Sequence, residues 1–179
     1  MNMKKILALA LCLVLVAGLS IGGTIAWITA STTKITNTFT VGDINITLAE
    51  SDNLDLKIIP GKTITKDPVV TVNADSEACW LFVKIEESAN FGTYMTYGVA
   101  DGWNPLAGHA GVYYREVAAT TAKVDFPVLK DDEVVVGEGV TKTQVEAAKT
   151  NAPTLSFTAY AIQKEGITSA TDAWDKLGV

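Results

Sequence analysis

The chain is poor in the residues on which most hydrolases depend. It has a single histidine, His109, among 179 residues. A zinc peptidase needs three protein ligands and an activated water, often with a His-Glu-x-x-His pair, and one imidazole cannot supply that set. A serine hydrolase would have the same His109 as its only possible base. We therefore interpret His109 as an ordinary loop residue, and we predict no catalytic residues, no metal site and no cofactor.

Cysteine is almost as scarce, which excludes a disulfide framework. The two cysteines are Cys12, in an apolar N-terminal run, and Cys79, beside Trp80 in a second apolar segment. If the first is removed with a leader, Cys79 has no partner within the chain. No base adjoins it in the sequence, so we expect a buried, inert thiol rather than a nucleophile.

Positive charge is also in short supply. The formal net charge is −6 at pH 7, and it becomes more negative still once Lys4 and Lys5 leave with the leader. Nucleic acid and anionic membrane surfaces both need a basic face. The balance disfavours those partners and suits a protein that resists non-specific association.

The N-terminus has the pattern of a signal sequence. Residues 1–5 are basic, residues 6–17 are continuously apolar, and Thr24 and Ala26 place small side chains at −3 and −1 of a cleavage site. We expect cleavage between Ala26 and Trp27. This divides the chain into a signal peptide (1–26), an N-terminal arm (27–40) and one domain (41–179), and it predicts a secreted protein of the cell surface or extracellular matrix.

Two other interpretations of the leader are possible. Residues 6–28 are long enough to cross a bilayer as an uncleaved anchor, although Gly22 and Gly23 interrupt them. A lipoprotein site at Cys12 fits less well, because the preceding residue, Leu11, is large and the apolar run continues past the cysteine. Membrane contact is expected only through an uncleaved leader.

Period-two alternation dominates the rest of the chain and predicts β-strands. The most apolar segment, residues 79–85, is expected to be a central strand buried on both faces, and Pro60 and Gly61 are placed for a type II turn. About seven such strands with turn-rich connections favour an antiparallel β-sandwich. The predicted strands are 44–48, 69–72, 79–85, 111–117, 124–129 and 155–163, with residues 38–41 leading into the first.

Two short stretches are helical in pattern. Thr141 and Gln144 have the spacing of a capping box. Ser169 or Thr171 can cap a last helix that carries Trp174. The predicted fold class is therefore all-β, with one or two short helices.

Several motifs occur in an order that resembles one family. They are Gly-Gly-Thr-Ile-Ala at 22–26, Asn-Thr-Phe-Thr-Val-Gly at 37–42, Ile-Pro-Gly at 59–61, Asp-Pro-Val-Val at 67–70 and Ser-Glu-Ala-Cys-Trp at 76–80. The set is similar to the TasA and camelysin family of Gram-positive proteins, which a SipW-type signal peptidase processes during export. The match covers the leader and the first half of the chain well and the second half only in two strands.

The resemblance implies a structural role. It suggests a jelly-roll-like sandwich that polymerises, alone or with accessory matrix proteins, into amyloid-like fibres of a biofilm matrix. In that family the mature N-terminal segment of one subunit is thought to complete the sheet of its neighbour, which makes the protein its own principal partner.

The arm itself is suited to such a contact. Residues 27–40 contain neither proline nor glycine, and they carry four apolar anchors, Trp27, Ile28, Ile35 and Phe39. A β-prone segment of this kind can add to an exposed strand edge through main-chain hydrogen bonds. It can equally fold back as the first strand of its own sheet, and the sequence leaves both arrangements open.

Other functions have to be weighed against a fibre subunit. A monomeric adhesin or carbohydrate-binding module could use an aromatic platform, although aromatic residues in sandwiches more often pack in the core. Camelysin-like proteins have also been classed as metallopeptidases. Two acidic stretches, 50–55 and 130–133, could offer oxygen ligands to calcium, but they lack a known loop motif and fit solvated hairpin tips better. The platform would consist of Tyr94, Tyr97, Trp103, Tyr113 and Tyr114.

Overall fold

The computed structural model describes Met3, residues 43–51 and residues 57–179. The chain divides into two units, Met1–Thr40 and Val41–Val179, and all the described strands belong to the second. The predicted cleavage site at Ala26 and Trp27 and the arm residues Ile28, Ile35 and Phe39 lie outside the described residues. Within the described ranges, no helix is both long and apolar enough to span a bilayer.

One layer of the fold is a four-stranded sheet in the order β10–β4–β7–β6. Every pairing in it is antiparallel, and β4 pairs along its length with β10 and with β7. Within the predicted range 79–85 every residue except Lys84 is buried, which confirms the prediction of a central strand covered on both faces. The four strands are β10 (Leu155–Gln163), β4 (Cys79–Glu87), β7 (Val112–Val117) and β6 (Asn104–Pro105).

The opposite layer consists of two three-stranded sheets, β1–β3–β8 and β2–β9–β5. Only Val128 separates β8 from β9, and its amide donates to the carbonyl of Pro68 while its own carbonyl accepts from Ala100. One continuous segment therefore serves both sheets, and the protein is an antiparallel all-β sandwich, as predicted. The strands are β1 (Ile46–Ala49), β3 (Val69–Val72), β8 (Val124–Pro127), β2 (Thr63–Thr65), β9 (Leu129–Val136) and β5 (Met95–Val99).

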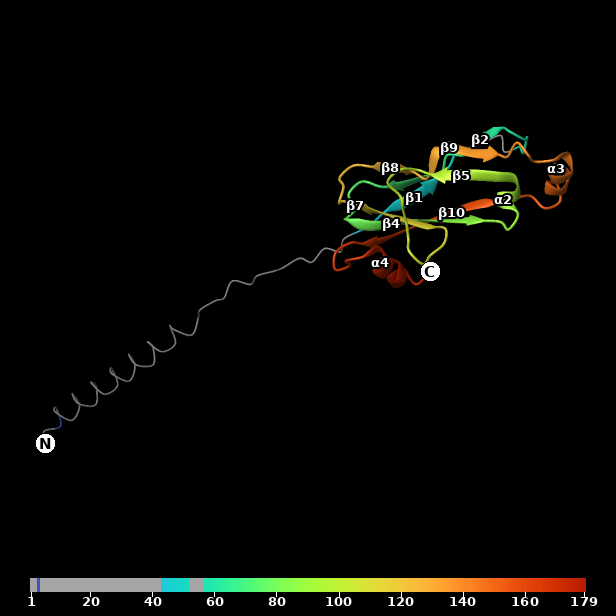
Figure 1. Ribbon diagram of the computed structural model, residues 1–179. Coiled ribbons are helices and arrows are strands. Elements are labelled where there is room, and N and C mark those ends of the chain that lie inside the picture. Colours follow the sequence, from blue (N-terminus) through green and yellow to red (C-terminus); the bar gives the residue numbers. More distant parts are fainter. Residues whose placement is uncertain (1–2, 4–42, 52–56) are drawn as a thin grey trace. The chain divides into compact units, whose positions relative to one another are not determined.

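The alternation of β4 divides the apolar interior into two parts. Its odd-numbered residues, such as Leu81 and Val83, pack between the layers against Val70 and Val72. Its even-numbered residues face the other way, where helix α4 (Ala170–Leu177) covers them (Figure 1).

Helix α4 is fixed to this outer face by aromatic packing. Trp174 lies 5.2 Å from Phe82 and 5.4 Å from Tyr160, measured between ring centres. Of the two predicted caps, Ser169 is the one used: its hydroxyl accepts from the amide of Asp172 at 3.1 Å.

A further apolar cluster fills one end of the sandwich, between β9, β5 and helix α3 (Lys142–Ala148). The predicted capping box at the start of α3 is present, with the Thr141 hydroxyl and the Gln144 side chain each bonded to the other's main chain. The predicted turn at 59–62 is present as well, with Gly61 at φ +74°. A single-turn helix, α2 (Phe91–Tyr94), was not predicted.

The prediction of a hairpin tip at residues 130–133 is wrong, because the chain continues through them as part of β9. In the ladder with β5, Val134 of β9 lies opposite Tyr97 and Leu129 lies opposite Val99. Five steps along β9 therefore correspond to two steps along β5. The extra residues form a bulge in which Asp131 and Asp132 adopt φ of 56° and 54°. Aspartate tolerates this left-handed conformation better than most residues do, so the charged run can remain inside a strand.

Candidate functional site

The edge of β10 is the most distinctive feature of the described surface. β10 pairs with β4 through nine consecutive register partners, from Leu155 opposite Glu87 to Gln163 opposite Cys79. Within the described ranges, no strand pairs with its other side. A nine-residue strand with one open side is long for an edge, and such edges are ready to pair with another chain.

The register shows which main-chain groups lie on that open side. The amide of Lys164 donates to Ala78, and the carbonyl of Thr154 accepts from Ser88, so the even-numbered residues of β10 bond toward β4. In an antiparallel ladder the alternate residues bond in the opposite direction. The amides and carbonyls of the odd-numbered residues therefore point away from β4, toward the open side: Leu155, Phe157, Ala159, Ala161 and Gln163.

Side chains beside this edge are incompletely covered. The first four of these odd-numbered residues pack against the inter-sheet core, as the sequence predicted. However, they are only half-buried, whereas Leu81 and Val83 on the neighbouring β4 are 0% exposed. The interior of the sandwich is thus accessible along β10.

Strand β1 borders the same open side from the opposite layer. Among the described strands it pairs with β3 alone, and it lies beside β10 without forming a ladder with it. A hollow of about 230 Å³ separates the two strands, lined by Leu48 and Ala49 on one side and Leu155 and Phe157 on the other. A second, mostly apolar hollow of about 490 Å³ continues from Leu155 toward Phe91 and Met95.

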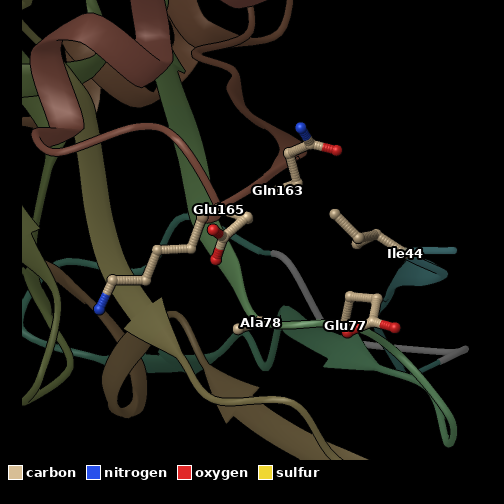
Figure 2. Close-up of a pocket in the computed structure, with 6 residues that line it drawn as sticks. Ile44, Glu77, Ala78, Gln163 and Glu165 are labelled. Atoms are coloured by element: carbon tan, nitrogen blue, oxygen red, sulfur yellow. The ribbon is translucent and has the colours of Figure 1, made fainter. Parts of the chain in front are cut away.

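A third hollow, of about 550 Å³, lies at the other end of β10. Figure 2 shows Gln163 and Glu165, from the end of the strand, on one side of it and Ile44 and Glu77 on the other. The carbonyl of Asp43 accepts a hydrogen bond from the amide of Glu77, so the chain enters the sandwich beside this hollow. Two hollows therefore lie at the Leu155 end of the open side, and the third lies at its Gln163 end.

One cation crosses the open side. The ammonium of Lys66 pairs with Glu50 at 2.7 Å and lies 5.3 Å from the centre of the Phe157 ring. The two partners come from opposite layers, since Glu50 follows β1 and Phe157 belongs to β10. Lys66 thus contacts residues of both layers beside an edge where the described strands form no ladder with each other.

The five predicted platform aromatics do not form one surface. Tyr94 and Trp103 are buried, in different clusters, and Tyr114 packs on the outer face of β4 with Trp80 at 5.9 Å. Tyr97 packs edge-on against Phe91 and donates to Glu87; burial and this bond both raise its pKa. They serve packing rather than a shared binding face.

The remaining candidate residues are apart from one another. His109 lies in a loop with its ring centre 6.0 Å from that of Trp174. Cys79 is free and 0% exposed, and burial raises the pKa of its thiol to about 11, as expected of an unreactive cysteine. In the part of the chain that the structure describes, no group of three or more His, Cys, Asp or Glu side chains is placed to hold a metal ion.

No protein-family model, curated protein or solved structure matches this chain.

Sequence reasoning identified β10 and the faces of its side chains but not its open edge. Alternation at 155–163 shows which side chains share a face, whereas the neighbours of a strand depend on long-range pairing. The only local signal is composition: Ala159 and Ala161 are small residues in the middle of a strand that has no charged residue to protect an edge.

Proposed function

We propose that this protein is a secreted structural subunit of extracellular matrix fibres, and that subunits join head to tail by β-strand complementation. The observation that carries the proposal is the nine-residue edge of β10, whose outward main-chain groups have no ladder partner among the described residues. The ordered motifs shared with the TasA and camelysin family support the same role, as does the β-prone arm at 27–40.

In this assembly the arm of one subunit pairs with β10 of the next. Main-chain hydrogen bonds to the odd-numbered residues of β10 supply sequence-independent affinity, and the flanking hollows accept alternate side chains of the added strand. The four apolar anchors of the arm are suited to the mostly apolar hollow that runs from Leu155 toward Phe91 and Met95. Donor and acceptor are different surfaces, so the contact does not close on itself and propagates a filament.

The test separates the donor from the acceptor. A protein lacking residues 27–40 retains β10 but has no arm, and the Ala159→Pro variant retains the arm but loses an outward amide of β10. Neither form is expected to give fibres by electron microscopy under conditions in which the secreted wild-type protein does. Mixed together, they are expected to give one-to-one heterodimers in analytical ultracentrifugation, because the single remaining donor meets the single remaining acceptor.

Two results would overturn the proposal. One is fibre formation by the arm-deleted protein at the wild-type rate, and the other is a failure of the wild-type protein to assemble under any condition. A mixture that contains only monomers would reject β10 as the acceptor while leaving polymerisation by another edge open. Glycan-array binding by a strictly monomeric wild-type protein would favour the adhesin alternative.

A further inference from the structure

The only arginine of the chain occupies an unusual position. Thirteen of the 14 basic residues are lysines, and the exception, Arg115, lies in β7 opposite Leu81 of β4. This register places Arg115 on the inner face of its sheet, at the side where β8 forms the edge of the other layer. It is thus remote in strand order from the open side between β1 and β10.

Two aromatic rings hold the guanidinium. Its central carbon lies 4.3 Å from the centre of the Phe126 ring and 5.2 Å from that of Trp103. Trp103 is itself fixed, because its indole N–H donates to the carbonyl of Pro127 at 2.8 Å. Contacts of this kind attract a guanidinium to the ring faces and restrict its position.

A glycine completes this cradle. At Gly102, with φ +87°, a Cβ atom would lie 2.4 Å from Nη2 of Arg115, so a side chain at this position would displace the guanidinium from its present place. We call Arg115, Trp103, Phe126 and Gly102 the arginine cradle.

Arg115 has no acidic partner among the described residues. Among the described residues, no ion pair or hydrogen bond joins the Arg115 side chain to a carboxylate, although the chain has 20 acidic residues. Burial is the only cause that lowers the pKa of Arg115, and no neighbouring negative charge opposes it. A half-buried cation held in place without a counter-charge is costly unless it meets an acceptor from elsewhere.

We propose that the arginine cradle is a binding site for a carboxylate group. A guanidinium fork matches the planar, two-oxygen geometry of a carboxylate, and the two ring contacts reduce the entropy that the arginine loses on binding. Nucleic acid and other polyanions require several cations together, whereas this site has one in an acidic protein. The carboxylate can be a free small acid or a side chain of another protein, and the test separates these sources.

The uniqueness of Arg115 gives a direct measurement. In a ¹⁵N-labelled full-length chain, held in a mild detergent, the arginine Nε–Hε region of the NMR spectrum contains one resonance. Titration with sodium acetate is expected to shift it saturably, whereas sodium chloride at the same ionic strength is expected to leave it nearly unchanged. Acetate is also expected to slow modification of this arginine by phenylglyoxal.

Two blocked peptides identify the source of the carboxylate. A saturable shift with Gly-Gly-Glu-Gly-Gly, but not with Gly-Gly-Gln-Gly-Gly, assigns the site to acidic side chains of proteins. A shift with acetate alone assigns it to small free acids. Equal shifts with both peptides, a response to sulfate without one to acetate, or no saturable shift with any carboxylate would overturn the proposal.

Two glycine variants provide a matched control. Gly102→Ala places a methyl group against Nη2 and is expected to abolish the acetate response. Gly108→Ala introduces the same kind of backbone strain, at φ +80°, but its Cβ would meet nothing within 4 Å. It is expected to keep the wild-type response, and loss of the response in both variants would contradict the role of the cradle.

Discussion

The ammonium group of Lys66 lies 5.3 Å from the centre of the Phe157 ring, directly at the open side of the sandwich. Its ion pair with Glu50 links this contact to the end of β1. One side chain thereby joins the two layers where main-chain pairing is missing, and this arrangement makes Lys66 important both for the stability of the subunit and for the geometry of its edge.

Replacing Lys66 by methionine tests the stabilising part of that role. The change keeps an apolar stem over Phe157 but removes the ion pair and the cation–π contact. Since the Lys66 side chain is only 14% exposed, we expect the free energy of unfolding to fall by about 1 kcal/mol. Urea unfolding at low and high salt measures it, and the difference from wild type should shrink as salt screens the pair.

Lys149→Met is the matched control for this prediction. Its pair with Glu146 joins two side chains that are 65% and 55% exposed, and pairs of that kind contribute almost nothing. Equal losses in the two lysine variants would show that Lys66 has no special position.

The Ala159→Pro variant is expected to fold but not to accept a strand. The amide of residue 159 points away from β4, and proline is tolerated on an edge strand where its missing N–H faces outward. Circular dichroism should therefore remain that of the wild type, while fibre growth on preformed seeds stops. The control variant Ala159→Ser retains the amide and should elongate seeds normally. If the proline variant does not fold, the amide of residue 159 bonds within the subunit, which would contradict its position on the open side.

The capping box gives a prediction about local stability. Thr141→Ala removes the hydroxyl that accepts from the amide of Gln144, at 3.3 Å, and should lower the free energy of unfolding by about 1 kcal/mol. Thr143→Ala, within the same helix and exposed, should be neutral or slightly stabilising because alanine is the better helix former. Thermal unfolding of the two variants side by side makes the comparison.

Burial of Cys79 predicts a pH dependence at the alkaline end. Its thiol has a pKa raised to about 11 in the folded protein from an ordinary value of 9.0. The contribution of the protonated Cys79 thiol to the free energy of unfolding is fully present below pH 9. It is lost as the pH rises toward 11, because the thiol of the unfolded chain ionises first.

The Cys79→Ala variant isolates this effect. The difference in unfolding free energy between wild type and variant should be constant below pH 9 and should then fall, by at most about 1.4 kcal/mol per pH unit. Chemical denaturation across this range measures it. A difference in unfolding free energy between wild type and Cys79→Ala that does not change with pH up to 11 would contradict the raised pKa of Cys79.

Local patterns predicted the parts of this fold that depend on local chemistry. The strand over residues 155–163 and the box at Thr141 were found because alternation and cap spacing belong to a few neighbouring residues. The same reasoning failed at Asp131 and Asp132, where a run of charges was interpreted as a solvated tip. Pairing of Val134 with both β2 and β5 holds those residues within a strand, and such a constraint comes from distant segments.

The candidate sites were harder to predict than the strands. Neither the open edge of β10 nor the arginine cradle has a sequence motif. Arg115, Trp103 and Phe126 are separated along the chain, and they meet through the pairing of β6 with β7 and the packing of β8 against that sheet. From the sequence, packing in the core was the favoured role for Trp103 and a carbohydrate platform the alternative; the structure buries this residue and places its ring against a cation.

The long register between β10 and β4 has a mechanical consequence. Nine consecutive partners align the two strands, so a pull directed along β10 loads all of their hydrogen bonds in shear at the same time. A pull directed across the strand would break them one after another, as a zipper opens. A subunit pulled through β10, along the direction of that strand, would therefore resist tension better than its free energy of unfolding alone would suggest.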